Sequence, residues 1–259
     1  MTTRLLTVLV LSLVAFAGCV GGEPAADDGT DVADGGAAPV DRSDLSVEAT
    51  DRLLRDAGSF TATWSYSTTE AAETTTITNA YQVDLQANRS IETFTMFGPD
   101  ARTDFETFVA DGSAYTRYET DGEAFYQVRP QDDTSFQSAV DRGTLSYESV
   151  DDARLVGTET FDGVTVDRYE YSDLSTWRQI GAGAFGSGEN VTVTDFTVVI
   201  LVDADGLARQ TEWTLTGETD DGETVSVEWR YEVTDVGSTA VPDPDWLDEA
   251  RAQQTDTAA

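Results

Sequence analysis

The sequence has no lysine, no histidine and a single cysteine among its 259 residues. Without histidine, a serine or cysteine nucleophile lacks its usual general base, and without lysine a Ser-Lys pair is excluded as well. One cysteine cannot form an internal disulfide, so the fold must be stable without one. Because these absences remove most catalytic constellations, we expect a protein that is not an enzyme and that carries no catalytic residue.

Basic residues are also scarce. All 15 are arginine, and they face 49 Asp and Glu residues, which gives a formal net charge of −34. No stretch clusters the arginines, so we expect no nucleic-acid partner. In molar salt, where the Debye length is about 3 Å, so large a charge would be screened. The acidic composition is therefore typical of a halophilic protein and indicates a habitat more than an activity.

The cysteine ends a segment that resembles the lipobox of secreted lipoproteins, since residues 13–19 read Leu-Val-Ala-Phe-Ala-Gly-Cys. Arg4 precedes an apolar run of about a dozen residues, which is typical of a signal peptide and too short for a permanent membrane span. The resemblance implies a signal peptide over residues 1–18 and a lipid on Cys19. This lipid would anchor the protein at the extracytoplasmic face of the cell membrane. The alternative is ordinary cleavage that leaves a free thiol.

Composition divides the remaining chain. Residues 19–42 are mostly Gly, Ala, Asp and Pro, and they cannot bury enough apolar surface to fold. We interpret them as a flexible acidic tether. Residues 43–247 have the length of one domain, and residues 248–259 are predicted to be a disordered tail.

Hydrophobic periodicity within the domain predicts a mainly β structure. A helix is expected over residues 44–56, because acidic residues fill its first turns and Gly58 follows it. From Phe60 onward apolar and polar residues alternate, which is the pattern of strands with one buried face. A further short helix is possible over residues 135–141. The segments 131–152 and 172–190 are less regular and could be flaps over one face of a sheet.

Asp-Gly pairs punctuate the β-rich part of the chain. This pair favours the type I′ turn of a tight hairpin. The spacing predicts an antiparallel meander of about ten or eleven strands. The pairs lie at residues 111–112, 121–122, 162–163, 205–206 and 221–222.

Several local motifs have ordinary structural interpretations. Residues 181–186 spell G-x-G-x-x-G, but no helix is expected after them, so we interpret them as a glycine loop. Residues 203–208 resemble the start of a calcium loop with glycine at the wrong position, so a hairpin turn and no metal are predicted. Two sequons, at Asn88 and Asn190, would accept an N-glycan in an exported chain. No cofactor is indicated.

The order of these elements resembles a known family. Residues 60–64, 109–115, 198–207 and 241–246 are similar to segments of the lipoprotein carriers LolA and LolB and of the lipid-binding lipoproteins LppX and LprG. The whole chain looks most like a haloarchaeal lipoprotein of unknown function. The resemblance implies a mainly β (α+β) fold, which is a single antiparallel curved sheet or unclosed half-barrel. Its concave face would hold acyl chains under the N-terminal helix and the flaps.

We therefore expect a membrane-anchored lipoprotein that binds a hydrophobic ligand such as a lipid or a lipoprotein acyl chain. The alternative interpretation of the aromatic residues is that they are simply core. In that case the protein would be a cell-surface interaction or envelope-structure module. A carboxylate hydrolase using acid pairs such as 151–152 or 220–221 is a third hypothesis. The candidate ligand-binding residues are Trp64, Tyr66, Phe94, Met96, Phe105 and Phe125.

Overall fold

The computed structural model describes residues 47–70, 72–99, 102–120, 122–131, 134–144, 153–172 and 191–257. The predicted signal peptide and tether, with Cys19, lie outside the described residues, as do Asn190, the glycine loop at 181–186 and the acid pair at 151–152. The helices are α1 (Val47–Ala57), α2 (Ser135–Thr144) and α4 (Leu247–Thr257). The strands are β1 (Ser59–Glu70), β2 (Glu73–Asp84), β3 (Arg89–Phe97), β4 (Arg102–Ala110), β5 (Ser113–Thr120), β6 (Glu123–Pro130), β7 (Arg154–Phe161), β8 (Val164–Tyr171), β9 (Val191–Asp203), β10 (Ala208–Thr219) and β11 (Thr224–Thr234).

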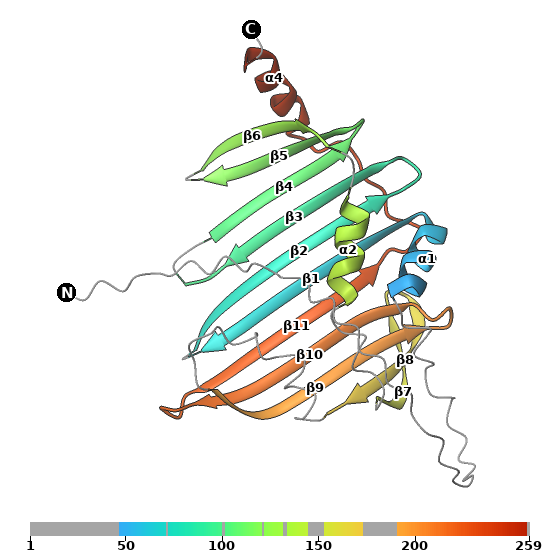
Figure 1. The fold of residues 1–259 in the computed structure, drawn as a ribbon, viewed down its shortest axis with the longest axis vertical. Coiled ribbons are helices and arrows are strands. Elements are labelled where there is room, and N and C mark those ends of the chain that lie inside the picture. The colour runs from blue at the N-terminus through green and yellow to red at the C-terminus, as the bar shows by residue number, and fades with distance from the viewer. Residues whose placement is uncertain are drawn as a thin grey trace, which may run out of the picture. The chain divides into compact units, whose positions relative to one another are not determined.

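In the described part of the chain the strands form one eleven-stranded sheet with the order β6-β5-β4-β3-β2-β1-β11-β10-β9-β8-β7 (Figure 1). Every neighbouring pair is antiparallel. The first and last strands, β1 and β11, meet in the middle, while β6 and β7 stand at opposite edges and leave the sheet unclosed. The prediction of a single open antiparallel sheet is confirmed.

The Asp-Gly turns connect neighbouring strands, as predicted, but they are of two kinds. At 111–112 and at 162–163 both residues have positive φ, with values of 53° and 71° in the first turn. This is the type I′ pattern. At 205–206 and 221–222 only the glycine has positive φ, 84° and 82° respectively. In these two hairpins, therefore, only the glycine of the pair adopts the left-handed backbone conformation.

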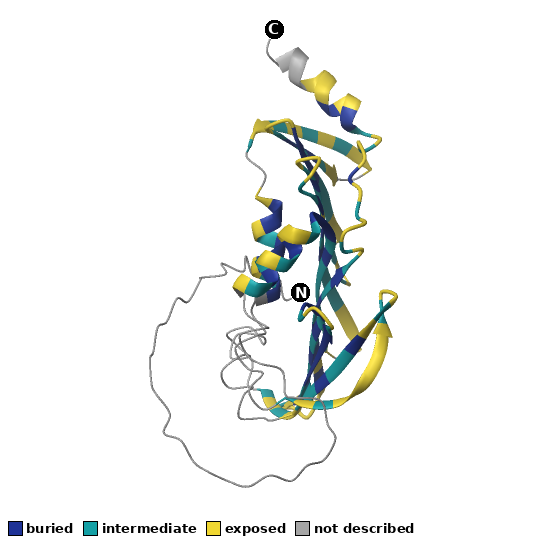
Figure 2. Cartoon of the chain, turned by 90° about the vertical axis from the view of Figure 1, so that its right-hand side faces the viewer, coloured by how far each residue is buried: buried dark blue, intermediate teal, exposed yellow. Residues whose placement is uncertain are grey.

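Helices α1 and α2 lie on the same face of the sheet, which we call the helix face (Figure 2). Helix α1 ends where the N–H of Gly58, at φ 80°, donates to the carbonyl of Leu54 at 3.2 Å. Helix α2 is longer than the predicted 135–141 segment. It approaches β11 closely because Gly143 has no side chain: a Cβ there would lie 2.6 Å from the ring of Tyr231.

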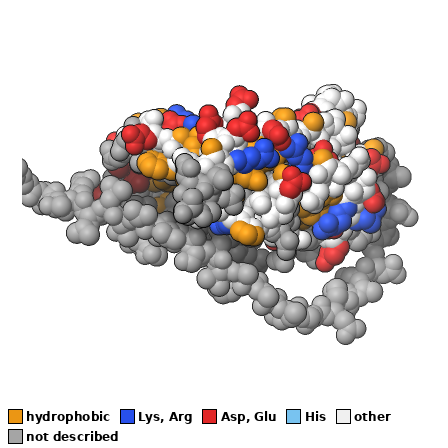
Figure 3. Space-filling model, turned by 90° about the horizontal axis from the view of Figure 1, so that it is seen from above, with side chains coloured by type: hydrophobic (Ala, Val, Ile, Leu, Met, Phe, Trp, Pro, Cys, Tyr) orange, Lys and Arg blue, Asp and Glu red, His pale blue; other side chains and the backbone are white. Residues whose placement is uncertain are grey.

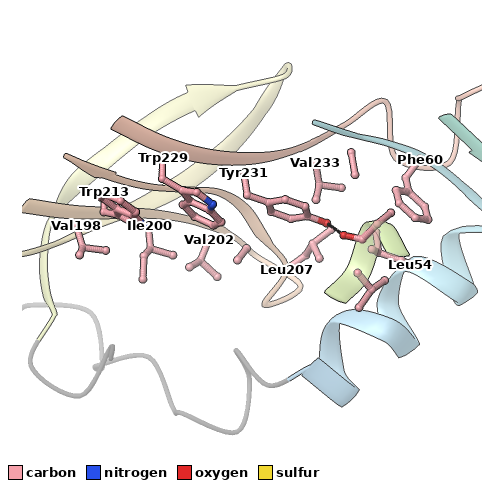
Figure 4. Close-up of a cluster of buried hydrophobic side chains, with 14 of the residues drawn as sticks. Leu54, Phe60, Val198, Ile200, Val202, Leu207, Trp213, Trp229, Tyr231 and Val233 are labelled. Carbon is pink, nitrogen blue, oxygen red and sulfur yellow. Dashed lines mark hydrogen bonds between the residues drawn. The ribbon is translucent and has the colours of Figure 1, made fainter. Parts of the chain in front are cut away.

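The main core lies on the helix face over β1, β2 and the strands from β8 to β11. The hydroxyl of Tyr231 donates to the backbone carbonyl of Ala139 in α2 at 3.0 Å, which ties the helix to the central strand (Figure 4). Trp213 and Trp229 stack in the same layer with ring centroids 6.3 Å apart. The largest fully buried side chains of this core include Leu54, Phe60, Phe196, Ile200, Leu215 and Tyr231.

The opposite face, which we call the outer face, carries a smaller cluster that includes part of the predicted tail. Residues 248–259 were expected to be disordered, and this is wrong for residues up to Thr257, because Leu247–Thr257 forms α4. Leu247 and Ala250 are buried, and Leu247 packs with Phe108 of β4. Two buried apolar side chains are too few to give a helical period in the sequence, yet they suffice to dock the segment.

Candidate functional site

The predicted ligand-binding residues fall in two rows that run across neighbouring strands. Directly opposite residues of an antiparallel pair share a face of the sheet. The register aligns Trp64, Asn79, Phe94, Phe105, Tyr118 and Phe125 in one row, and Tyr66, Ile77 and Met96 in the next. Both rows are on the helix face. We call their apolar and aromatic members the apolar strip: Trp64, Tyr66, Ile77, Phe94, Met96, Phe105, Tyr118 and Phe125.

The apolar strip becomes more exposed toward the β6 edge. Phe94 and Phe105 are half-buried and stack with their ring centroids 5.0 Å apart and their planes at 13°. Phe105 then contacts Tyr118 at 5.9 Å. Tyr118 is 40% exposed and Phe125 is 52% exposed. The strip is therefore a continuous apolar surface over β3 to β6 that packing within the sheet does not bury.

Helices α1 and α2 cover the neighbouring part of the helix face, where α1 packs on β1 and α2 packs on β1, β2, β3 and β11. Phe136 of α2 packs edge-on against Phe60 at 5.6 Å. Ser90, which follows the start of β3, donates to the hydroxyl of Ser135 at 2.8 Å. In the last turn of α2 the Arg142 guanidinium lies over the ring of Trp64, 4.9 Å from its centroid. The C-terminal end of α2 therefore borders the strip at Trp64.

A small group of buried polar side chains lies at this border. Asn79 is 2% exposed and its amide nitrogen donates to the hydroxyl of Tyr81 at 2.9 Å and to the carboxylate of Glu92 at 3.1 Å. Burial raises the pKa of Tyr81 to about 12, and Glu92 adds to the rise while Arg142 opposes it. Tyr81 therefore remains a neutral hydroxyl across the physiological range.

Two polar atoms of this border are left without a partner. Within the described residues, neither the indole nitrogen of Trp64 nor the amide oxygen of Asn79 has a hydrogen bond, although both atoms are buried. The two residues are directly opposite each other on β1 and β2. A donor and an acceptor thus lie unpaired at the inner end of the apolar strip.

Comparison with protein-family models identifies the family of this chain. The model of a family of unknown function, DUF7537, matches residues 4–250. The chain belongs to this family. The comparison with curated proteins finds no match.

Solved structures similar to this DUF7537 chain include a LolA superfamily protein from Nitrosomonas europaea. It is 10% identical, the match covers 80% of this chain and 96% of that one, and the TM-score is 0.24. A DUF1329 family protein from Desulfovibrio piger is 11% identical, with 80% and 98% covered and a TM-score of 0.23. An uncharacterized conserved protein from Thermus thermophilus is 11% identical, with 74% and 91% covered and a TM-score of 0.23. TM-scores and identities this low transfer neither a role nor a ligand to this chain.

All six predicted ligand-binding residues lie on the helix face, because each is an even number of residues away from the other helix-face positions of its strand. The structure brings Phe94 and Phe105 into contact, whereas Phe125 lies at the edge and is separated from Phe105 by Tyr118. Sequence reasoning missed Tyr118 and Ile77. Both alternate in phase with buried neighbours on their strands, so the same period could have identified them.

The remaining candidate residues have local roles or lie exposed. Asn88 is exposed in the β2–β3 turn at φ 52°, so its glycosylation stays a prediction. The Asp203 carboxylate binds Arg209 at 2.6 Å and accepts the backbone N–H groups of Asp205 and Leu207 at 3.0 Å, which makes the 203–208 segment a hairpin turn. The acid pair at 220–221 is exposed in the β10–β11 turn. Across the described ranges no helix is long and apolar enough to cross a membrane.

Proposed function

We propose that this protein is a lipoprotein anchored at the extracytoplasmic face of the membrane, where it binds a hydrophobic ligand on the apolar strip. The observation that carries the proposal is the gradient of exposure along one row of aromatic residues. Phe94 and Phe105 stack and are half-buried, and Phe125 at the end of the row is half-exposed. A row of rings that served only as core would be buried along its whole length.

Charge supports the same proposal. Acidic side chains are frequent on the surface, where they lie among arginines and apolar groups (Figure 3). The complete row from Trp64 to Phe125 contains no charged residue on any of its six strands, and burial raises the pKa of Tyr66 in the next row. Contiguous apolar patches on a soluble surface commonly mark a binding site. An acyl chain lying along the strip would gain about 0.8 kcal/mol for each buried methylene.

Binding can be tested with the fluorescent probe N-phenylnaphthylamine on the full chain in molar salt. The strip variant is Phe125→Ser, and its matched control is Phe97→Ser, because Phe97 is 60% exposed on the outer face. We expect the strip variant to weaken probe binding several-fold and the control to leave it unchanged. Decane should displace the probe from the wild type.

Failure of the wild type to bind the probe, or equal losses in the two variants, would overturn the proposal. The exposed rings of the strip would then be assigned to contact with a protein partner, as in the surface-module hypothesis. Because both phenylalanines are exposed, neither substitution should cost much folding stability, and equal melting temperatures would confirm that a binding loss is local.

The anchor is a separate part of the proposal and rests on the lipobox resemblance of residues 13–19. Replacing Cys19 with Ser removes the thiol that would carry the lipid. We expect the variant to be released from membranes or to remain unprocessed, as seen by fractionation with and without detergent. A correctly cleaved variant that still needs detergent for extraction would contradict lipidation at Cys19.

A further inference from the structure

The unpaired atoms at the inner end of the apolar strip are unusual for buried groups. A buried indole N–H normally finds an acceptor, and a buried amide oxygen normally finds a donor, because leaving either unpaired costs free energy. Here the nitrogen of Trp64 and the oxygen of Asn79 are both buried and both unpaired within the described residues. They belong to directly opposite residues, so one ligand atom could serve both.

The assignment of the Asn79 amide is consistent with its surroundings. Its nitrogen donates to the Glu92 carboxylate at 3.1 Å. Exchanging the amide oxygen and nitrogen would place two acceptors against each other. The oxygen is therefore the unpaired atom, and two directly opposite residues carry one unpaired donor and one unpaired acceptor within the described part of the chain.

A hydroxyl group is complementary to this pair, because a single oxygen accepts one hydrogen bond and donates another. A charged head group fits less well. A carboxylate could accept from Trp64 but would face the Asn79 oxygen, and an ammonium group could donate to Asn79 but would face the Trp64 N–H. The charges of Glu92 and Arg142 have opposite signs and favour neither group. The border thus selects a neutral group that both donates and accepts.

We propose that the hydrophobic ligand of the apolar strip is a lipid alcohol, whose hydroxyl accepts from the Trp64 indole N–H and donates to the Asn79 amide oxygen. The inference rests on the proposed function, because the alkyl chain of the alcohol would extend from this border along Phe94 and Phe105 toward the β6 edge. The ligand therefore has a polar end that is held beside α2 and an apolar end that is directed to the exposed rings.

The test compares decanol with decyl methyl ether, decane and decanoate as competitors of N-phenylnaphthylamine on the full chain in molar salt. The ether keeps the acceptor of the alcohol and loses its donor, so the alcohol-to-ether ratio reports the bond to Asn79. We expect decanol to displace the probe at about five- to tenfold lower concentration than the ether, as one hydrogen bond in a buried site allows. Decane and decanoate should be weaker still.

The variant Trp64→Phe removes the indole N–H while keeping an aromatic ring beneath Arg142. It should weaken decanol and the ether about fivefold more than it weakens decane, because all three lose the same ring area but only decanol and the ether lose the hydrogen bond. The matched control is Trp246→Phe, since the indole of Trp246 donates to Glu106 on the outer face, away from the strip. The control should change none of the competitors.

The outcomes separate the two proposals. If decane fails to displace the probe, the proposed function itself is wrong. If decane displaces it and decanol is no better, the unpaired atoms bind water and the lipid alcohol is wrong. A preference for decanoate would assign an anionic ligand and would also overturn the inference.

Discussion

Two parts of the sheet, β9–β11 and β3–β6, carry stacked aromatic residues on the same face, and we call these parts the two wings. The rings are buried in the first wing and partly exposed in the second. In the β9–β11 wing, Trp213 and Trp229 stack at 6.3 Å and are 9% and 4% exposed. In the β3–β6 wing, Phe94 and Phe105 stack more closely, at 5.0 Å, yet remain half-buried, and Phe125 beyond them is half-exposed. Aromatic stacking therefore does not distinguish a core from a surface. The distinction depends on what packs above the rings.

Helix α2 covers the centre of the sheet, between the two wings. It contacts β1, β2, β3 and β11, and its Ala139 carbonyl accepts the hydroxyl of Tyr231. Its last turn borders the strip with Arg142 over Trp64. Strands β4 to β6 carry the more exposed end of the row. The comparison predicts different costs for truncating rings in the two wings.

Of the substitutions that compare the helix face of the two wings, Trp229→Ala in the β9–β11 wing is expected to have the largest effect. Removing a buried tryptophan leaves a large cavity and should cost about 3–5 kcal/mol of unfolding free energy. Phe94→Ala in the other wing should cost clearly less, because its ring is half-buried. Urea denaturation in molar salt measures both. Equal costs would show that the two wings are packed alike.

The second prediction concerns the contact between α2 and the central strand. Gly143→Ala would place a methyl group 2.6 Å from the Tyr231 ring. The clash should cost up to about 3 kcal/mol, against the roughly 1 kcal/mol that alanine gains over glycine in a helix, so we expect a net loss of stability. In a Tyr231→Ala background the same substitution should become neutral or stabilising. Thermal melts of the four proteins test this reversal, and a loss that persists without the ring would contradict it.

A third prediction compares two phenylalanines of β4 that face opposite sides. Phe105 belongs to the apolar strip, whereas Phe108 is fully buried on the outer face beneath the α4 segment. Phe105→Ala should cost about 1–2 kcal/mol of stability, because its ring is only half-buried, and should weaken probe binding several-fold. Phe108→Ala should cost about 3–5 kcal/mol and leave binding by the folded fraction unchanged. If Phe108→Ala weakened probe binding and Phe105→Ala did not, the ligand would be placed on the outer face.

The smallest effect is expected from Glu232, which neighbours Tyr231 on β11 but faces outward. Burial raises the pKa of its carboxyl, Arg230 lowers it, and Glu212 and Glu228 raise it again. A raised pKa means that the folded state binds the proton more tightly than the unfolded state, so stability falls as the pH rises through this range. Glu232→Gln should therefore raise the melting temperature slightly at neutral pH. The difference between variant and wild type should vanish below the carboxyl's ordinary pKa, and a constant difference would contradict it.

Much of this fold could be predicted from the alternation of apolar and polar residues and from the Asp-Gly pairs of the turns. Even spacing from Phe60 to Tyr66 places those side chains on one face, and the Asp-Gly pairs separate the strands where the structure turns. The six proposed ligand residues share a face for the same reason. Alternation reports which side a residue is on, but not whether another element covers it. Both Trp229 and Phe105 alternate equally well, although only Trp229 is buried.

The features that sequence reasoning missed depend on contacts between distant segments. Helix α4 has only Leu247 and Ala250 to bury, so its docking depends on a surface that β4, β5 and β6 provide together. Trp64 and Asn79, which carry the unpaired nitrogen and oxygen, are brought opposite each other only by the β1–β2 register. The contact of Arg142 with Trp64 depends on the position of α2. None of these is a property of local sequence.

The seam between β1 and β11 has a consequence for assembly. It joins Thr61–Glu70 to Val225–Thr234, so strands at opposite ends of the domain sequence pair at the centre of the sheet. The chain is synthesised from its N-terminus, so hairpins within β1–β6 can form early. One edge of β1 stays unpaired until β11 has been synthesised. Pairing over so large a sequence separation is intrinsically slow. The centre of the finished sheet is thus the last part to close, and until then its edge is available to other unfinished chains.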